Sequence, residues 1–540
     1  MSKIFCTFGP SFKSMAKIHF RPYTTKQILL FPQRIDENIA DDDPVRLVNG
    51  LIDQLDLTSF RKLYKGYGRS PFHPQMMLKA VIYGYMNNVY SCRKIEERLV
   101  RDVHFIWLAG YEHPDYITIN RFRNRVKKEI NAVFTQVVLL LAERGFISLD
   151  VEYIDGTKIE SKANKYTFVW RKTVEKNRAR LLEKIRVLLE QIDDVIAQDN
   201  ASGQEKVGVT PELLHSMVSE LNAALASEPK PVTTEEKERR KERKKQAREL
   251  QEKADKLAEY DEHLEKLGDR NSYSKTDPDA TFMRLKEDAM NNGQTKPGYN
   301  VQMSTENQFI TNYGIFWRPT DQGTLIPYIT SFSDRYGFQS DEICADSGYG
   351  SEQNYAHLFG IGVTPYVKYN MFHAEEKRHR RENPFLVQNL YYNAEENYYV
   401  CPMGQHMEHI GDVESISDLG YVSVVSKYRA RNCAGCPLRC LCYRGIADRT
   451  IEVNHVSNAY RAEARRLLTS ERGLHHRSMR PIEPEAVFGD IKYNHGFKRF
   501  KLKSSAKVSV EFGLVALAHN LRKYIALGAP GCSVTGDSCL

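Results

Sequence analysis

A segment with helical periodicity, residues 165–270, separates two strand patterns and most constrains what this chain folds into. Apolar residues recur in it at the heptad spacing of a coiled-coil seam. They are Val174, Leu181, Ile185, Leu188, Ile192 and Val195 in a first arm, and Leu250, Leu257 and Leu264 in a second. Pro229 and Pro231 mark a turn region between the arms. We therefore predict an antiparallel helical hairpin inserted into another domain.

The strand patterns that flank this insertion each run into an aspartate and a glycine. Alternating β-forming residues in LDVEYIDGTKIE predict a core strand that ends at Asp155. The run EICADSGYG predicts a short buried strand that ends at Asp346. Between them, residues 299–305 and 309–317 flank a short polar break and predict an antiparallel hairpin.

The N-terminal part of the chain is predicted to be helical. Helical spacing of apolar residues covers 44–55 and 74–86, and Ser91 has the character of an N-cap for 93–101. Thr118 is expected to cap a last, basic helix that contains Arg121, Arg123, Arg125, Lys127 and Lys128. This order is similar to a helix-turn-helix unit, so we expect Arg121, Arg123 and Arg125 to contact DNA. The alternative is an ordinary solvated helix face.

The C-terminal part combines an amphipathic helix with a basic segment. The helix, 483–493, carries Glu485, and Lys492 lies near the same flank. From Lys492 to Val510 there are six basic residues, among them Lys492, Lys498 and Arg499, and no acidic ones. We expect this segment to line the path of a DNA backbone. A solvated basic loop is the alternative.

Two aspartates at strand ends and a glutamate on a later helix are what a two-metal phosphodiester site requires. Mg²⁺ prefers carboxylate oxygens and keeps positions open for phosphate and water. The candidates are Asp155, Asp346 and Glu485, with Glu483 as a rival for the third place. Three other carboxylates lie in the interval and are candidates for a supporting role, although turn formation explains the first two more simply. They are Asp277, Asp279 and Asp321.

These stretches resemble the DDE transposases of prokaryotic insertion sequences, which have a ribonuclease-H-like catalytic core. The matching stretches are YIDGTKIE, ADSGYGSEQN and EPEAVFGDIKYNHGFKRF. HPQMMLKAVIYGY, SCRKIEERL and ALAHNLRK also look like that family, so the resemblance extends over nearly the whole chain.

The resemblance implies that Asp155, Asp346 and Glu485 bind Mg²⁺ or Mn²⁺. Lys492 stands six intervening residues after Glu485, as in the family's Tyr-Arg-Glu-Lys signature, whose basic residues hold DNA phosphates. Arg480 is one position further from Glu485 than that signature places its arginine. Arg477 is therefore a rival for the arginine's role.

The resemblance also implies an activity. The chain is expected to cleave phosphodiester bonds at the ends of its own mobile element, after which the freed 3′-hydroxyl attacks target DNA. Its partners would be the element ends, the target DNA and a second copy in a synaptic homodimer. Two alternatives stay open: a ribonuclease-H-like nuclease or resolvase, and a catalytically silent DNA-binding regulator.

The cysteines suggest a second metal. Five of the ten cysteines lie between Cys401 and Cys442. A structural Zn²⁺ ion is expected on Cys401, Cys433, Cys436 and either Cys440 or Cys442, because thiolates favour a closed tetrahedral zinc site. His406 and His409 are substitutes for one of these ligands, and unliganded thiols are the alternative.

We therefore expect an α/β multidomain protein with a ribonuclease-H-like mixed β-sheet core. The expected division is an N-terminal extension (1–20), a helical DNA-binding region (21–147), a core in three parts (148–164, 271–380 and 456–530), the helical insertion (165–270), a cysteine-bearing insert (381–455) and a tail (531–540). The formal net charge of +8 is compatible with nucleic acid as a partner. No apolar run approaches the roughly 20 residues of a membrane span, and the expected compartment is the cytoplasm.

Overall fold

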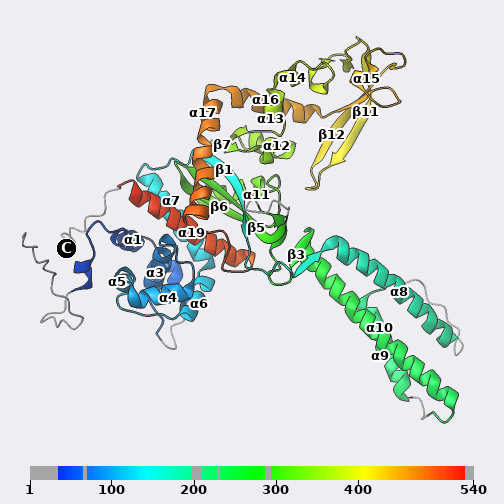
Figure 1. Ribbon diagram of the computed structural model, residues 1–540, viewed down its shortest axis with the longest axis horizontal. Helices are drawn as coiled ribbons and strands as arrows, with labels where there is room; N and C mark the ends of the chain where they lie inside the picture. The colour runs from blue at the N-terminus through cyan, green and yellow to red at the C-terminus, as the bar shows by residue number, and fades with distance from the viewer. Residues whose placement is uncertain (1–33, 65–69, 198–208, 228–230, 286–293, 529–540) are drawn as a thin grey trace, which may run out of the picture.

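The computed structural model describes residues 34–64, 70–197, 209–227, 231–285 and 294–528, with the side chains of 191–197 left out. Figure 1 shows N-terminal helices against a central sheet, and two insertions that extend away from that sheet. Within the described ranges, no helix combines the length and the apolar character that crossing a bilayer requires.

The central sheet is mixed. It has the order β4-β5-β1-β7-β8, with β6 on the same edge of β5 as β4. Its strands are β1 (Val151–Glu160), β4 (Thr281–Arg284), β5 (Thr295–Glu306), β6 (Phe309–Phe316), β7 (Glu342–Ala345) and β8 (Thr364–Val367). β1 is antiparallel to β5 and parallel to β7, which in turn is parallel to β8. The sheet thus changes from antiparallel to parallel at β1.

The strand predictions are confirmed with one exception. β5 and β6 form the predicted hairpin, and its turn residues Asn307 and Gln308 have positive φ angles of 50° and 60°, as tight hairpin turns require. The prediction that the first strand ends at Asp155 is wrong. β1 continues to Glu160 because Asp155 and the five residues after it still pair with β5.

The N-terminal region is helical, as predicted. Its helices are η1 (Ile35–Asn38), α1 (Pro44–Asp53), α2 (Thr58–Arg61), α3 (Pro74–Met86), α4 (Cys92–Arg101), α5 (Val103–Leu108), α6 (Tyr116–Arg125) and α7 (Lys127–Glu143). Thr118 is not the N-cap of α6. The cap is Asp115, whose carboxylate accepts the Thr118 N–H at 2.7 Å. The basic stretch is also two helices, divided at Val126.

These helices share one hydrophobic core with the sheet. α3 is buried from Met77 to Met86 and packs against α19 (Ser505–Ala526), which also contacts α7 and β6. Phe134 of α7 meets Tyr313 of β6 edge to face, with ring centroids 5.0 Å apart. Burial of this continuous apolar surface holds the N-terminal region on the sheet.

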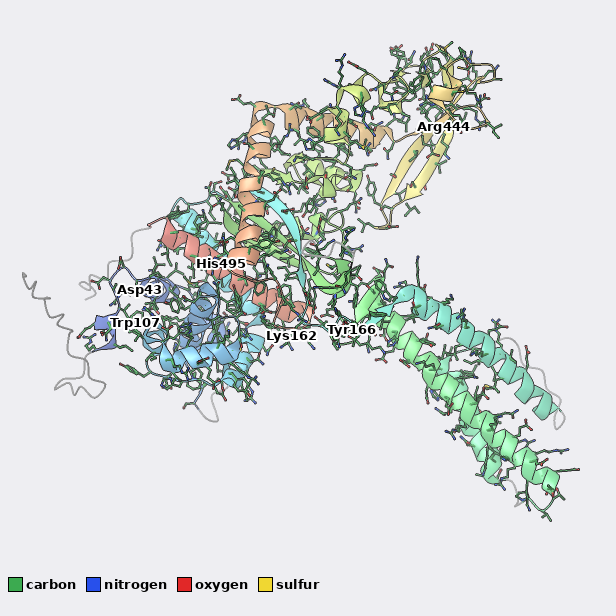
Figure 2. The ribbon with its side chains drawn as sticks, in the orientation of Figure 1. Asp43, Trp107, Lys162, Tyr166, Arg444 and His495 are labelled. Atoms are coloured by element: carbon green, nitrogen blue, oxygen red, sulfur yellow. The ribbon has the colours of Figure 1, made fainter. Side chains whose placement is uncertain are left out.

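The described residues of the helical insertion form the two predicted arms and a further helix between them in the sequence. α8 (Arg171–Ala197) and α10 (Thr234–Leu267) are the predicted arms, and α9 (Pro211–Ser227) packs against α10 and contributes to the core that the three helices share. Its core consists of Ile185, Leu188, Leu214, Val218, Leu250, Ala254 and Leu257. The strands β2 (Phe168–Trp170) and β3 (Ser272–Ser274) pair at its base, where Figure 2 shows Lys162 and Tyr166. The side chains of Ile192 and Val195, and Pro229, lie outside the described residues.

The cysteine-bearing insert contains an antiparallel sheet that the sequence analysis did not predict. Its order is β13-β12-β11-β10-β9, and Arg444 lies in this insert (Figure 2). The strands are β9 (Tyr391–Asn393), β10 (Tyr398–Val400), β11 (His406–Ile416), β12 (Val422–Ala430) and β13 (Thr450–Val453). The short helices α13 (Phe372–Glu375), α14 (Arg378–Arg381) and α15 (Arg439–Cys442) accompany the sheet.

Helices cover the parallel half of the central sheet and then lead to the predicted glutamate. α11 (Leu325–Tyr336), α12 (Glu352–Gly360), α16 (His455–Thr469) and α17 (Glu471–Met479) precede a π-helical turn η4 (Pro481–Glu485), α18 (Ala486–Gly489) and a second π-helical turn η5 (Asp490–Asn494). Pro484 has no N–H to donate, so it cannot support an ordinary α-helical turn at this point.

Candidate active site

Two aspartates from distant parts of the chain lie beside each other on adjacent parallel strands. The last paired residues of β1 and β7 are Ile154 and Ala345. The residue after Ile154 is Asp155, still within β1, and the residue after Ala345 is Asp346, directly behind the end of β7. The β1–β7 register therefore brings together two carboxylates that are 346 − 155 = 191 positions apart in the sequence.

The guanidinium of Arg480 links these two aspartates to Glu485. Its Nη2 lies 3.1 Å from Oδ1 of Asp155, and its Nη1 lies 3.3 Å from Oδ1 of Asp346. The same Nη1 lies 3.5 Å from Oε1 of Glu485, the last residue of η4. The three carboxylates expected from the sequence thus surround one cation.

Arg480 is buried beneath more accessible carboxylates. Its side chain is 5% exposed, whereas those of Asp346 and Glu485 are 48% and 52% exposed. Burial acts to lower the pKa of Arg480, but Asp155, Asp346, Cys344 and Glu485 together outweigh burial and raise that pKa. Arg480 is therefore a permanent positive charge. Its Nε is buried and has no hydrogen-bond partner among the residues that the structure describes.

A π-helical turn explains why Arg480 is offset in the sequence. Arg480 stands five positions before Glu485, and a π-helix bonds residues five positions apart. The extra residue is therefore absorbed within η4, and both side chains reach the same site. Arg477 points elsewhere: its Nη2 lies 3.9 Å from Glu376, and its guanidinium lies 5.0 Å from the ring centroid of Phe372.

Glu483 and Glu485 have different surroundings. Glu483 is 1% exposed and accepts the backbone N–H of Gln308 at 2.8 Å. Burial raises its pKa, although the hydrogen bond from Gln308 opposes this. Glu483 therefore links the helix to the β5–β6 turn, while Glu485 joins the aspartates.

Polar side chains on β5 support the site, and they were not predicted from the sequence. Asn300 and Gln302 donate to Oδ1 of Asp321 at 2.7 and 2.9 Å, and Tyr349 donates to Oε1 of Gln302. Asp321 also lies against Gly156, because a Cβ placed on that glycine would be 2.8 Å from Asp321 Oδ1. Polar residues at alternate positions of a buried strand were the sequence feature that could have indicated these side chains.

Asp277 and Asp279 have structural partners instead. Asp277 accepts hydrogen bonds from Ser161 Oγ at 2.5 Å and from the Tyr299 hydroxyl at 3.0 Å. Asp279 accepts the backbone N–H of Ser505 at 2.8 Å. Both therefore fix the segment that begins α19 and the turn before β4.

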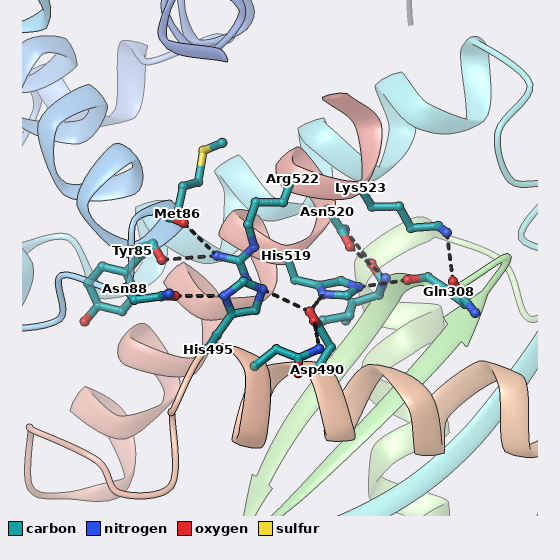
Figure 3. A network of polar contacts seen from close by, with 12 residues as sticks. Tyr85, Met86, Asn88, Gln308, Asp490, His495, His519, Asn520, Arg522 and Lys523 are labelled. Carbon is teal, nitrogen blue, oxygen red and sulfur yellow. Dashed lines mark hydrogen bonds and ion pairs between the residues drawn. The ribbon is translucent and has the colours of Figure 1, made fainter. Parts of the chain in front are cut away.

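A polar network holds the end of the glutamate-bearing helix (Figure 3). His519 Nδ1 and His495 Nε2 each lie 3.2 Å from Oδ2 of Asp490. The hydrogen bond with His519, more than any other contact, lowers the pKa of Asp490. Arg522 donates to the carbonyls of Tyr85 and Met86 at 3.2 Å. The network thus connects η5, α19 and the N-terminal helix α3.

The expected DNA-contacting residues after Glu485 differ in accessibility. Lys492 is 5% exposed, and its Nζ donates to the carbonyl of Lys158 at 3.1 Å. Lys498 Nζ lies 4.5 Å from the ring centroid of Tyr493. Arg499 pairs with Glu160 at 3.4 Å and donates to the Ser161 carbonyl at 3.1 Å. Lys492 therefore lies beside β1, beyond Asp155.

The basic residues of α6 also differ in accessibility. Arg121 is exposed, and with Arg125 it lines a groove of about 840 Å³. Arg125 also stacks on Tyr64, with 4.9 Å between the guanidinium carbon and the ring centroid. Arg123 is 4% exposed and donates to the Tyr85 hydroxyl at 3.0 Å. Its expected contact with DNA is corrected: Arg123 packs inside the N-terminal core.

Four of the five clustered cysteines border one cavity of about 30 Å³, namely Cys401, Cys433, Cys436 and Cys442. Cys440 is exposed and does not line it. Arg449 donates its backbone N–H to Cys433 Sγ at 3.3 Å and Nη1 to Cys442 Sγ at 3.0 Å. His406 and His409 are not in the lining: His406 stacks on Tyr398, and His409 contacts Asp412 at 2.9 Å.

Neither cluster forms a ready-made metal site. Across the described ranges, no set of three or more His, Cys, Asp or Glu side chains is arranged to hold a metal ion. At the carboxylates, the positive charge of Arg480 lies within ion-pair distance of all three side chains. The expected zinc site stays a prediction. Cys6, Cys532 and Cys539 lie outside the described residues.

Comparison with known proteins gives two matches. A family model described as a transposase DDE domain matches residues 400–525, and one described as a transposase domain (DUF772) matches residues 33–125. The first range contains Arg480, Glu485 and Lys492. Asp155 and Asp346 lie outside both ranges. Searches of curated proteins and of solved structures find no match.

Proposed function

The chain belongs to the DDE transposases of insertion elements, and from this premise we propose that it cleaves the ends of a mobile DNA element and joins the freed 3′-hydroxyl to target DNA. The observation that carries the proposal is the convergence of Asp155, Asp346 and Glu485 around Arg480. Three carboxylates that meet repel one another, and the single positive charge of Arg480 compensates only one of them, so the cluster has room for further cations.

The proposal includes a ribonuclease-H-like core. The strand order, with an antiparallel β6-β5-β1 half and a parallel β1-β7-β8 half, supports it. The positions of Asp155 and Asp346 at the centre of that sheet support it further. We also propose that the N-terminal helices bind DNA, with Arg121 and Arg125 at the groove of α6.

The carboxylates fit a divalent metal ion in chemical type, because they already surround a positive charge and oxygen ligands suit Mg²⁺ or Mn²⁺. When bound, such ions activate the attacking hydroxyl and stabilise the leaving oxygen. Asp155, Asp346 and Glu485 would hold them. Lys498 and Arg499 follow Glu485, are exposed, and would contact DNA phosphates, adding salt-dependent affinity. Lys492 is buried against β1 and would act instead by fixing the helix that carries Glu485.

We further propose a homodimer, because joining two element ends calls for an assembly that holds both ends. A structural zinc ion would be bound by the thiolates of Cys401, Cys433, Cys436 and Cys442. The metal content of the purified chain would reveal its presence. We place the activity in the cytoplasm.

Strand transfer tests the function directly. The purified chain is incubated with a labelled duplex of the element end, a supercoiled plasmid target and Mg²⁺. We expect cleavage at the element boundary and then a labelled, joined plasmid, with both products absent in EDTA. Cleavage without joining would support the nuclease alternative, and DNA binding without cleavage in either Mg²⁺ or Mn²⁺ would support the silent regulator.

A further inference from the structure

Arg480 uses the same three carboxylates that the proposed function assigns to a divalent metal ion. Its Nη2 forms an ion pair with Asp155, and its Nη1 forms ion pairs with both Asp346 and Glu485. The guanidinium is buried, while the side chains of Asp346 and Glu485 are about half exposed. The protein thus contains its own cation for the triad.

A metal ion would have to compete with this arginine. Mg²⁺ requires oxygen ligands at about 2.0–2.1 Å in a nearly fixed geometry. Arg480 holds one oxygen of each carboxylate, so the guanidinium, and not a metal ion, sets the orientation of all three groups. A divalent ion placed beside a buried guanidinium also meets like-charge repulsion in a poorly solvated environment.

DNA offers Arg480 another anion. A guanidinium pairs well with phosphate oxygens because its N–H groups match them in two-point contacts. Arg480 also has one N–H to spare, since its buried Nε has no partner in the described part of the chain. A phosphate that enters the site could therefore attract the guanidinium and free the carboxylates.

We propose that Arg480 is the resident counter-cation of Asp155, Asp346 and Glu485, and that it keeps divalent-metal binding weak until a DNA phosphate draws the guanidinium away. This inference rests on the proposed function. It makes metal binding and DNA binding cooperative, so each tightens the other by the same factor. As a consequence, the three carboxylates bind the divalent metal ions needed for hydrolysis only weakly until the element end is bound.

Mn²⁺ binding, followed by the electron paramagnetic resonance signal of the free ion, tests the inference without an activity readout. The wild type, Arg480→Gln and Arg477→Gln are compared with and without a pre-cleaved duplex of the element end. Arg477 is a matched control because it lies three positions earlier and contacts Glu376 instead of the triad. Asp155→Asn is added to the wild-type and Arg480→Gln backgrounds. The Mn²⁺ binding that this substitution removes is the binding that occurs at the site.

Without DNA, we expect Arg480→Gln to bind Mn²⁺ about tenfold more tightly than the wild type, and Arg477→Gln to bind like the wild type. DNA should tighten Mn²⁺ binding about tenfold in the wild type and much less in Arg480→Gln. If Arg480→Gln does not fold, as its circular dichroism would reveal, Arg480→Ala and Arg480→Met take its place with the same expectation.

The inference is overturned if removal of Arg480 leaves Asp155-dependent Mn²⁺ binding unchanged or weakens it. In that case the proposed function would still stand, because Asp155 would still bind the ion. If Asp155→Asn changes Mn²⁺ binding in neither background, with or without DNA, the assignment of the metal site itself fails, and the inference fails with it.

Discussion

Replacing Glu485 by glutamine is expected to slow cleavage at the element end by about a thousandfold, or about 4 kcal/mol of activation free energy. The amide keeps the size of the side chain but removes the charge that faces Asp155 and Asp346 through Arg480. A neutral amide is a much weaker ligand for a hard divalent cation. Single-turnover cleavage of a labelled duplex in Mg²⁺ measures the effect.

Glu483→Gln is the matched control for this variant. Glu483 is buried and accepts an N–H from Gln308, a role that a glutamine oxygen can also fill. We expect cleavage within about fivefold of the wild type, because no contact with the triad changes. A large loss with Glu483→Gln and normal cleavage with Glu485→Gln would instead move the third carboxylate to position 483.

Gly350→Ala is expected to destabilise the protein by about 3 kcal/mol, the range in which overpacked sites fall. A Cβ on Gly350 would lie 2.2 Å from the carbonyl oxygen of Lys368 and 2.8 Å from Cα of Tyr369. Both are backbone atoms, so the clash cannot be relieved by a side-chain rotation. Gly350 follows the short helix η2 (Ser347–Tyr349) after Asp346, and the shift would also displace that carboxylate.

Gly348→Ala provides the comparison within the same turn. A Cβ there would meet only the Asp321 side chain, at 3.6 Å from Oδ2 and 3.7 Å from Cβ, which are ordinary contact distances. Its expected change in stability is within about 0.5 kcal/mol. Thermal unfolding midpoints of both variants beside the wild type measure this difference. Equal midpoints would show that the close approach at Gly350 does not constrain the loop.

Short-range sequence patterns predicted much of this fold. The heptads of the insertion predicted α8 and α10, and the alternation around Asp155 and Asp346 predicted two strands whose register brings the carboxylates together. The end of β1 was predicted wrongly because an Asp-Gly pair ordinarily terminates strands, whereas here β5 provides hydrogen-bond partners as far as Glu160. Pairing with a distant strand leaves no local signal.

The remaining differences at the site have the same origin. The offset of Arg480 depended on a π-helical turn around Pro484, which sequence spacing alone does not indicate. Arg123 looked like a member of an exposed basic face, but its Nη1 donates to the Tyr85 hydroxyl and the Tyr90 carbonyl in the core. Cys440 and Cys442 were indistinguishable in spacing, and only the cavity separates them.

Iron-directed cleavage of the chain itself tests the central claim, that Asp155, Asp346 and Glu485 hold one catalytic metal centre. Fe²⁺ replaces Mg²⁺ in the complex with element-end DNA, ascorbate and peroxide generate hydroxyl radicals at the bound ion, and the protein fragments are mapped. We expect cuts in the segments around all three residues, and their loss in Asp155→Asn. Cuts that avoid these segments, or that persist unchanged in Asp155→Asn, would contradict the account.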